Sequence, residues 1–332
     1  MKPWLVAWGL IAGLGLAAAE PALPPAAPAD TAVLVVVGAA GEDQYGTVFA
    51  NEAADWQKLC SEAGAKCRVI GQAAEGPVAD HELLRQALEA EPKDGLTKLW
   101  LVLIGHGTFD GREAKFNLRG PDLTVTELAL WLLPFHRPLA VIDTSSASAP
   151  FLSKLSGPDR VIVTATRSGD EQNYARFGPD FVAALADPKS DLDKDGEVSL
   201  LEAFLSASAR VAEYYKTEGR LATEHALIDD NGDGLGTPPD WFEGVRAVKK
   251  AGGGAAVDGP LAQQFVLIPS AAERQLSPGV RAERDRLELA VAHLREGKAK
   301  LPEDQYYAQL EALLLQLARL YPPPPADAAG SD

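Results

Sequence analysis

Short, continuously apolar runs that end near turn-forming residues constrain the fold of this chain more than any other feature. Residues 31–38 and 99–104 are such runs, and shorter strand candidates lie at 67–70, 139–142 and 160–164. A strand that is apolar at every position is buried on both faces, as in a parallel sheet covered by helices. Because segments with helical spacing of apolar residues lie between these runs, we predict an α/β domain with a mostly parallel sheet flanked by helices. The functional site of such a sheet lies at the carboxyl ends of its strands.

The first residues have the organisation of a secretory signal peptide. Lys2 precedes an apolar run at 4–16, and the alanines at 17–19 supply the small residues of a cleavage site. We therefore expect export to the periplasm or the outside of the cell, with cleavage after Ala19. A membrane anchor is the alternative, but the run is short for a bilayer span, so we expect no stable membrane span after cleavage.

Composition divides the rest of the chain into further parts. Gly252, Gly253 and Gly254 mark a linker, and two leucine-rich stretches with helical spacing follow at 280–298 and 303–321. Packed as an antiparallel hairpin, these two stretches would bury their apolar faces against each other. The predicted divisions are a signal peptide at 1–19, a linker at 20–30, the main domain at 31–250, a linker at 251–277, a helical hairpin at 278–321 and a disordered tail at 322–332.

Charge and cysteine content narrow the partners and the compartment. The 332 residues carry a formal net charge of −16, which argues against nucleic acid and anionic membranes as partners and is compatible with the binding of cations. Cys60 and Cys67 lie close together in the sequence. In an oxidising compartment we expect them to form a local disulfide, because neither has a histidine or a further cysteine at metal-ligand spacing.

Candidate catalytic residues follow two of the predicted strands. His106, between two glycines, comes directly after the run at 99–104. The glycines would let a substrate approach the backbone closely, and the N–H of Gly107 is suited to an oxyanion hole. The run at 139–142 leads into a cluster of hydroxyl side chains that includes Ser145. Because both runs end at the same edge of a parallel sheet, we expect His106 and Ser145 to lie near each other.

This pattern resembles the Gly-His-Gly and Asp-Thr-Cys motifs of the legumain/caspase-like cysteine peptidases. The residue sequence of the two motifs is most similar to that of the GPI-anchor transamidase branch. The resemblance implies a caspase-like fold over residues 32–240, with His106 as the catalytic histidine and Ser145 at the position of the nucleophilic cysteine. It also implies an oxyanion hole formed by the N–H groups of Gly107 and Ser145. A later stretch resembles the strand and loop that line the specificity pocket of the family. The pocket residues that it implies are Thr164, Thr166, Arg167, Gly169 and Asp170.

Serine at the position of the cysteine changes the chemistry. A hydroxyl is a far weaker acid than a thiol and needs a general base whose orientation is fixed by a third group. Asp110 and Asp143 are the candidates for orienting His106. Three hypotheses remain open. The favoured one is an inactive homologue that binds a peptide or protein segment, because the cysteine is missing. The others are a peptidase or transpeptidase that uses Ser145 with His106 as base, and an interaction protein that acts through the hairpin.

Residues 191–202 fit the calcium loop of an EF-hand at every key position. Acidic side chains stand at the first, third and fifth positions, Gly196 permits the sharp turn at the sixth, and a predicted helix follows. We expect a bound Ca²⁺ with a structural rather than a catalytic role. The expected ligands are Asp191, Asp193, Asp195, Glu197 through its carbonyl, Ser199 and Glu202.

A second, weaker loop repeats the opening of this pattern at residues 229–234. Asp240 falls at the twelfth position, but Pro238 and Pro239 replace the usual entry into a helix. The loop is therefore either a second calcium site or a rigid turn. The expected ligands are Asp229, Asn231, Asp233 and Asp240.

Overall fold

The computed structural model describes residues 31–74, 76–252 and 256–321. The predicted signal peptide, the linker at 20–30 and the tail at 322–332 lie outside the described residues, as does most of the triglycine. No helix within the described part of the chain is long and apolar enough to span a bilayer.

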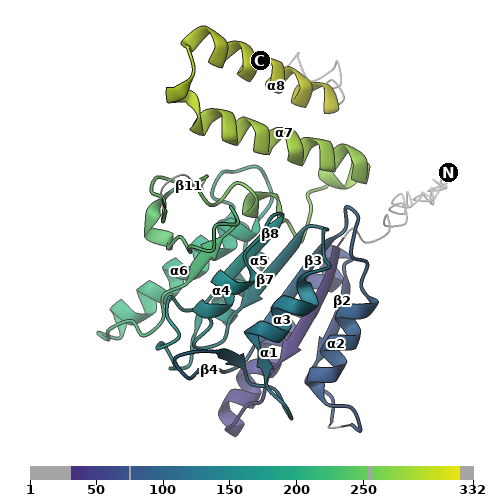
Figure 1. Ribbon diagram of the computed structural model, residues 1–332, viewed down its shortest axis with the longest axis vertical. Helices are drawn as coiled ribbons and strands as arrows, with labels where there is room; N and C mark the ends of the chain where they lie inside the picture. Colours follow the sequence, from purple (N-terminus) through teal and green to yellow (C-terminus); the bar gives the residue numbers. More distant parts are fainter. Residues whose placement is uncertain (1–30, 75, 253–255, 322–332) are drawn as a thin grey trace, which may run out of the picture.

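A six-stranded sheet forms the centre of the molecule (Figure 1). Its strands lie in the order β2-β1-β3-β7-β8-β9, and all neighbours pair in parallel except β9, which runs antiparallel to β8 at one edge. The mostly parallel sheet predicted from the apolar runs is therefore confirmed. The strands are β1 (Thr31–Val37), β2 (Lys66–Ile70), β3 (Lys98–Ile104), β7 (Leu139–Asp143), β8 (Arg160–Thr164) and β9 (Leu227–Asp229).

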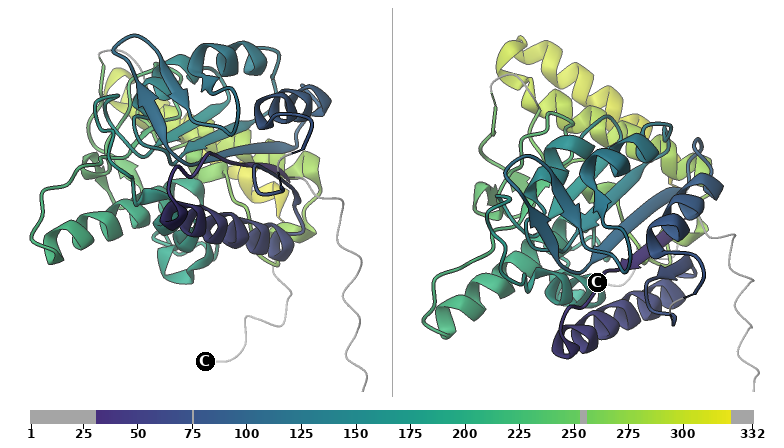
Figure 2. Two further views of the ribbon diagram at one scale, coloured as in Figure 1. Left: turned by 90° about the horizontal axis from the view of Figure 1, so that it is seen from below. Right: turned by 60° about the horizontal axis from the view of Figure 1, so that its bottom comes forward.

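Helices cover both faces of this sheet, which explains why its central strands are apolar at successive positions. In β3, Leu101 and Leu103 pack on one face while Trp100 and Val102 pack on the other. One face is covered by α2 (Asp80–Ala90), α3 (Val125–Leu132) and α4 (Ala149–Leu155). The other face is covered by α1 (Asp43–Ala63), α5 (Phe177–Ala186) and α6 (Leu200–Thr217), as the two views of Figure 2 show.

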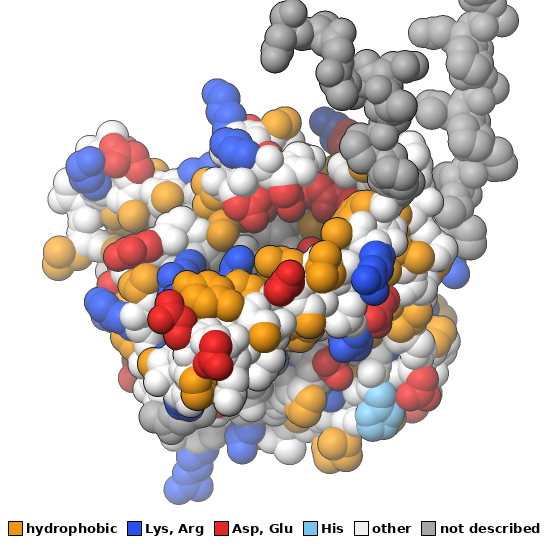
Figure 3. Space-filling model, turned by 90° about the horizontal axis from the view of Figure 1, so that it is seen from above, with side chains coloured by type: hydrophobic (Ala, Val, Ile, Leu, Met, Phe, Trp, Pro, Cys, Tyr) orange, Lys and Arg blue, Asp and Glu red, His pale blue; other side chains and the backbone are white. Residues whose placement is uncertain are grey.

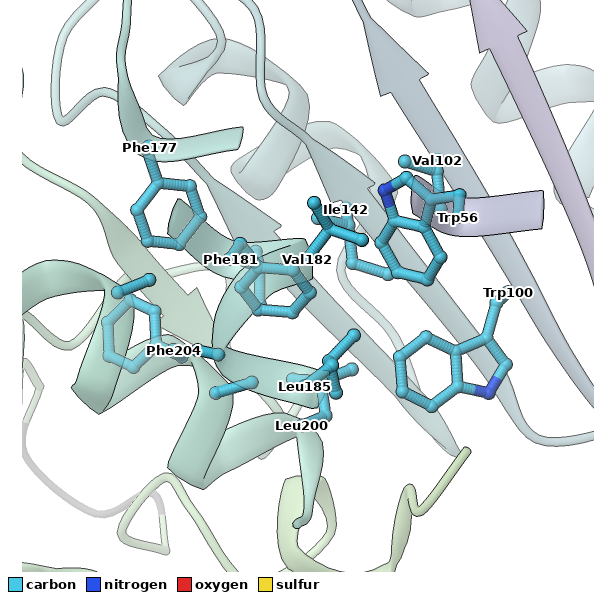
Figure 4. Close-up of a cluster of buried hydrophobic side chains, with 14 of the residues drawn as sticks. Trp56, Trp100, Val102, Ile142, Phe177, Phe181, Val182, Leu185, Leu200 and Phe204 are labelled. Atoms are coloured by element: carbon cyan, nitrogen blue, oxygen red, sulfur yellow. The ribbon is translucent and has the colours of Figure 1, made fainter. Parts of the chain in front are cut away.

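The core on the α1–α5–α6 face is built around aromatic side chains. Trp56 of α1 meets Trp100 of β3 and Phe181 of α5, in each case with ring centroids 6.2 Å apart (Figure 4). Phe177 and Phe204 extend the cluster toward α6, with their centroids also 6.2 Å apart. Burial of such large rings stabilises the packing of the helices on the sheet.

Two smaller sheets decorate the central one. A three-stranded antiparallel sheet at the carboxyl edge consists of β4 (Gly107–Phe109), β5 (Ala114–Phe116) and β6 (Leu123–Thr124). A short antiparallel pair consists of β10 (Phe242–Glu243) and β11 (Arg246–Ala247).

The C-terminal hairpin of α7 (Pro278–Glu296) and α8 (Glu303–Leu320) lies at the opposite, amino edge of the sheet (Figure 1). Lys98, at the start of β3, forms an ion pair with Asp285 of α7 at 3.2 Å. The side-chain amide of Gln264 donates to the backbone carbonyl of the same Asp285 at 2.5 Å. The hairpin is therefore attached through α7, and α8 lies farthest from the sheet.

The prediction that residues 251–277 form a linker separate from the main domain is wrong. Ala262, Phe265 and Leu267 are buried in the core on the α1–α5–α6 face, and Ser199 forms an isolated β-bridge with Val266. The apolar side chains of this segment pack against the main domain because they complete its core. The main domain thus extends beyond residue 250 to the base of the hairpin.

Candidate functional site

The carboxyl edge of the sheet brings the two predicted catalytic segments together. Leu103 of β3 pairs with Asp143 of β7, so the loops that follow the two strands begin side by side. A side chain at Gly107 would put its Cβ 2.2 Å from the carbonyl oxygen of Ser146 and 3.0 Å from Oγ of Ser145. Only glycine permits this approach of β4 to the hydroxyl cluster. The expected proximity of the Gly-His-Gly and Ser145 segments is therefore seen in the structure.

His106 lies in an aromatic cluster formed mainly by side chains of α1. Its ring meets Tyr45 edge-on with centroids 4.7 Å apart and Phe49 at 5.1 Å, while Tyr174 completes the cluster at 6.4 Å. Desolvation lowers the pKa of His106, and a hydrogen bond to the backbone of Ala40 opposes this change in part. The imidazole is thus neutral at neutral pH. Among the described residues, no hydrogen bond joins it to Ser145.

Ser145 makes its hydrogen bonds to the strand that carries it. Its Oγ donates to Oδ1 of Asp143 at 2.6 Å, its N–H donates to the same oxygen at 3.0 Å, and both residues are fully buried. Burial raises the pKa of Asp143 to about 7, while the hydrogen bonds from Ser145 act to lower it. Asp143, one of the two residues considered for orienting His106, therefore binds Ser145 instead. Asp110 instead accepts from the N–H groups of its own turn and is exposed.

The predicted oxyanion hole is not formed in this structure. The N–H of Gly107 donates to Oγ of Ser146 at 3.1 Å, and the hydroxyl of Ser146 donates back to the carbonyl of Gly107 at 3.1 Å. The N–H of Ser145 is bound to Asp143, as described above. Both N–H groups that would stabilise an oxyanion are thus already satisfied inside the protein, which corrects the assignment made from the sequence.

The predicted specificity pocket needs a similar correction. Thr164 and Thr166 are fully buried, and the hydroxyl of Thr164 donates to the carbonyl of Thr166 at 2.9 Å. Gly169 is buried against the ring of Phe109, where an added Cβ would approach ring atoms to 2.4 Å. These three residues close the strand ends instead of lining an open pocket. Arg167 and Asp170 are the members of the set with exposed side chains.

The loop after β8 is held by a contact between Glu171 and His225, which the sequence analysis did not predict. Oε1 of Glu171 lies 2.5 Å from Nδ1 of His225, which comes just before β9. The other oxygen of Glu171 accepts from the N–H of Arg167 at 3.0 Å, and the carbonyl of Glu171 accepts from the N–H of Ala147 at 2.8 Å. Glu171 therefore joins the segment after Ser145 to the loop after β8. Only the tertiary structure brings these distant residues together.

Glu52 is a further residue that the sequence analysis missed. It is buried on the inner face of α1, and burial raises its pKa to about 8, while a hydrogen bond from Thr144 lowers it in part. The hydroxyl of Thr144 lies 3.3 Å from Oε1 of Glu52. The spacing from Phe49 to Glu52, Ala53 and Trp56 would have placed this glutamate on the apolar face of the helix.

The first acidic loop has the donor arrangement of a calcium site. Single oxygens of Asp191, Asp193 and Asp195 lie within 4.8 Å of one another. Asp191 accepts from the N–H groups of Lys194 at 2.6 Å and Gly196 at 3.2 Å, and both of these residues have positive φ. This wrapping of the backbone around the first aspartate directs the three carboxylates toward one point. Carboxylate oxygens are the kind of ligand that Ca²⁺ prefers.

Glu202 closes this loop from the first turn of α6. Its Oε1 accepts from the N–H groups of Leu192 at 2.7 Å and Asp193 at 3.2 Å, and its Oε2 accepts from the hydroxyl of Ser199 at 2.8 Å. Glu197 directs its carboxylate elsewhere, to the N–H of Ser270 at 2.5 Å. That leaves its carbonyl as the group expected at the seventh position.

The second acidic loop has the same backbone arrangement. Asp229 accepts from the N–H groups of Gly232 and Gly234, each at 3.1 Å, and both glycines have positive φ. Asn231 and Asp233 accept from the residues two positions further on, as Asp193 and Asp195 do in the first loop. The chain therefore folds the two loops in the same way despite the prolines that follow the second.

Asp258, and not Asp240, makes the contacts in the second loop that Glu202 makes in the first. Oδ1 of Asp258 accepts from the N–H groups of Asp230 at 2.9 Å and Asn231 at 3.1 Å, and its Oδ2 accepts from the hydroxyl of Thr237 at 2.5 Å. Asp240 is exposed in a short 3₁₀ helix. Asp258 follows the triglycine, so its spacing from the loop gave no signal in the sequence.

The two cysteines are brought together at the end of α1 and the start of β2. Both are free thiols in this structure, Cys60 buried and Cys67 exposed. A hydrogen bond between their side chains raises the pKa of Cys60 and lowers that of Cys67. The disulfide expected from the sequence stays a prediction, and the contact between the thiols is what its formation requires.

Comparison with known proteins identifies no family. No protein-family model matches the chain, and no curated protein matches it. Among solved structures, the chain is similar to the initiator caspase Dronc of Drosophila, at 13% identity and a TM-score of 0.43 over 63% of this chain and 82% of Dronc.

Two further solved structures are similar at the same level. One is caspase-1 from Spodoptera frugiperda, at 9% identity and a TM-score of 0.38, covering 61% of this chain and 87% of that one. The other is a protein from Geobacter sulfurreducens, at 12% identity and 0.40, covering 60% and 92%. With TM-scores below 0.5, these similarities carry no argument about activity, so function has to be inferred from the residues of this chain.

Proposed function

We propose that this protein is an exported, catalytically inactive homologue of the legumain/caspase-like peptidases that binds a peptide or protein segment at the carboxyl edge of its sheet. The observation that carries the proposal is the hydrogen bond from Oγ of Ser145 to the buried carboxylate of Asp143 at 2.6 Å. A nucleophile must be accessible to substrate and within reach of its base. Ser145 meets neither condition.

The state of the neighbouring groups supports inactivity. The imidazole of His106 is held by a hydrogen bond to the backbone of Ala40, but among the described residues no hydrogen bond joins it to Ser145, whose proton it would have to accept. The N–H groups of Gly107 and Ser145 are also satisfied internally. A serine peptidase mechanism would require Ser145 and both N–H groups to exchange these hydrogen bonds for contacts with His106 and the substrate.

The same edge presents a surface that suits binding. Tyr45, His106 and Tyr174 are each half-buried and expose part of an aromatic cluster whose base is the fully buried Phe49. Rigid aromatic side chains offer a large contact area at low entropic cost, and they dominate many recognition surfaces. A neutral imidazole adds a hydrogen-bonding group without a charge that would have to be desolvated.

Calcium completes the proposal as a structural ion. Asp191, Asp193 and Asp195 would hold it in the first loop together with Glu202, and the carboxylates of Asp229, Asp233 and Asp258 would hold a second ion. Bound Ca²⁺ would neutralise carboxylates whose mutual repulsion otherwise opposes folding of the loops. Neither loop contributes a side chain to the contacts of His106 or Ser145 described above.

Cleavage of a peptide library, followed by mass spectrometry in the presence of calcium, tests the inactivity. We expect the wild type to cleave no more than His106→Ala and Ser145→Ala, with circular dichroism establishing that all three are folded. Cleavage by the wild type that disappears in both variants would overturn the proposal and establish a serine-dependent hydrolase.

Selection from a phage-displayed peptide library tests the binding. Peptides retained by the wild type should be lost by Tyr45→Ala and Tyr174→Ala, because these remove the exposed rings. Leu221→Ala is the matched control, since Leu221 is 91% exposed in the loop after α6. Retention of the same peptides by both tyrosine variants would rule out this surface.

A further inference from the structure

Tyr174 of the aromatic cluster lies in a short segment whose backbone makes few contacts of its own. Its ring packs on that of Tyr45, with centroids 5.1 Å apart. The N–H groups of residues 173–175 donate to no other residue in the part of the chain that the structure describes. The location of the ring therefore depends on what holds the two ends of the segment 171–176.

His225 holds the first end of this segment. Its Nδ1 lies 2.5 Å from Oε1 of Glu171, and Oε2 of Glu171 accepts from the N–H of Arg167 at 3.0 Å. The backbone carbonyl of Glu171 accepts from the N–H of Ala147 at 2.8 Å. Both the side chain and the backbone of Glu171 are thus fixed, so the segment leaves the sheet edge from a defined point.

Glu224 holds the other end of the segment. Its buried Oε2 accepts from the N–H of Arg176 at 2.8 Å and from that of Phe177 at 3.0 Å, where α5 begins. These N–H groups have no partner within the helix, so a carboxylate at this place fixes the start of the helix. The other oxygen of Glu224 accepts from the hydroxyl of Tyr215 in α6 at 3.0 Å.

The two holding residues are consecutive in the chain, in the segment between α6 and β9. That segment passes along the carboxyl edge of the sheet, which the left view of Figure 2 shows from below. His225 contacts the loop after it leaves β8, and Glu224 contacts it where α5 begins. One short segment therefore fixes both ends of the stretch that carries Tyr174.

We propose that Glu224 and His225 are positioning residues for peptide binding, which set the location of the Tyr174 ring beside Tyr45 and His106. The inference rests on the proposed function, because it takes the aromatic cluster as the surface that the peptide contacts. The two residues act on the peptide through the ring of Tyr174. A ring that is already in place costs less conformational entropy on binding, so holding it raises the affinity.

A double-mutant cycle between His225 and Tyr174 tests the proposal, with the peptide most enriched by the wild type as the probe. We expect His225→Ala to raise the dissociation constant at least about fivefold, because Glu171 loses its partner. In a Tyr174→Ala background the same substitution should have little further effect, since the ring that it positions is absent. His225→Asn should retain most of the affinity, because its amide can donate in place of Nδ1.

Hydrogen exchange of the free protein measures how the loop is held when no peptide is present. We expect exchange to quicken at least about threefold at residues 167–171 in His225→Ala, and at residues 176–177 in Glu224→Gln. Tyr307→Ala is the matched control, because it removes an exposed tyrosine from α8, on the hairpin side of the molecule that Figure 3 shows. It should change neither the exchange nor the affinity for the peptide.

Two results would overturn the proposal. The first is an equal loss of affinity from His225→Ala with and without the Tyr174 ring, which would mean that His225 acts independently of that ring. The second is unchanged exchange across residues 167–177 in both variants. Failure of the proposed function is distinguishable, because the wild type would then retain no peptide or Tyr174→Ala would retain them all. Exchange in the free protein would in that case decide by itself whether Glu224 and His225 position the loop.

Discussion

The hydroxyl and the N–H of Ser145 are both satisfied by the strand end that carries them. Its Oγ forms a 2.6 Å hydrogen bond with Asp143 two residues earlier. The bond also supplies a partner for a carboxylate buried among the strand ends. A thiol is a much weaker donor and would leave that carboxylate less well satisfied. Ser145 therefore has a structural role, because its hydroxyl satisfies the buried carboxylate at the end of β7.

Ser145→Ala should lower the free energy of unfolding by about 1–2 kcal/mol, because Asp143 would lose a buried hydrogen bond. Chemical denaturation at neutral pH measures the change. Peptide binding should be unaffected, since the hydroxyl does not reach the surface. Unchanged stability would mean that the bond to Asp143 contributes nothing to the fold.

Glu52→Gln should raise the stability of the protein and reduce its dependence on pH. The pKa of Glu52 is about 8 in the fold against an ordinary value of 4.5, so the folded state binds the proton more tightly than the unfolded chain. Its contribution to stability is therefore complete below about pH 4.5 and is lost as the pH rises toward 8. We expect Glu52→Gln to gain on the order of 2 kcal/mol at pH 9 and little at pH 4.

Thermal unfolding between pH 4 and pH 9 checks this prediction. Glu62→Gln on the same helix is the matched control, because that glutamate is exposed and should show no comparable gain. Equal effects of the two substitutions at pH 9 would contradict a special role for burial at Glu52.

At the scale of elements, the two acidic loops fold alike although only the first is followed by a helix of ordinary EF-hand type. In the first loop the closing carboxylate comes from α6, eleven residues after Asp191. In the second it comes from Asp258, beyond β11 and the triglycine. A loop of this kind thus needs a carboxylate at the right place in space, and the chain can supply it from a distant segment.

Calcium titration by calorimetry distinguishes the two candidates for closing the second loop. We expect two sites in the wild type, one in Asp258→Asn and two in Asp240→Asn, since only Asp258 contacts the loop backbone as Glu202 does. Glu202→Gln should remove the first site. Loss of a site in Asp240→Asn, with binding unchanged in Asp258→Asn, would reverse the assignment.

The cysteine contact between α1 and β2 predicts that a stabilising disulfide forms under oxidising conditions. Oxidation should raise the free energy of unfolding by about 2 kcal/mol. This value is at the low end for a disulfide, because the loop that it closes is short. Comparing melting temperatures with and without dithiothreitol measures the effect, and Cys67→Ser should abolish the difference. A reductant effect that persists in Cys67→Ser would have another origin.

The whole molecule separates its surfaces onto opposite edges of one sheet. The aromatic cluster of His106 lies at the carboxyl edge, whereas the hairpin is docked at the amino edge through Lys98 and Asp285. The first acidic loop lies beside the base of the hairpin, where Glu197 accepts from the N–H of Ser270. This hydrogen bond links the first acidic loop to the segment that leads into the hairpin. The aromatic cluster of His106 lies at the opposite edge of the sheet from both.

Calcium should consequently protect the hairpin more than the aromatic edge. We expect hydrogen exchange in α7 to slow on addition of calcium, because an ordered first loop holds Glu197 against the segment that leads into the helix. Asp191→Asn should remove this protection. Equal slowing in β4 and α7 would indicate a general stabilisation instead of a local connection.

The sequence by itself determined the sheet and several of the segments that meet at its edges. Apolar runs such as residues 99–104 predict buried parallel strands because burial on both faces demands apolar side chains at every position. The backbone arrangement of the first acidic loop was predictable because the key positions of its pattern are contiguous. The nearness of His106 to the Ser145 segment followed from the common edge at which parallel strands end.

Only the tertiary structure decided which polar groups meet. The hydrogen bonds of Ser145 to Asp143, of Glu171 to His225 and of Asp258 to the second loop depend on side-chain direction and on contacts between distant segments. The same holds for residues 256–268, which resembled a linker but complete the core. Local patterns specify periodicity and burial, whereas the partner of a buried polar group depends on which donor the folded chain brings within about 3 Å.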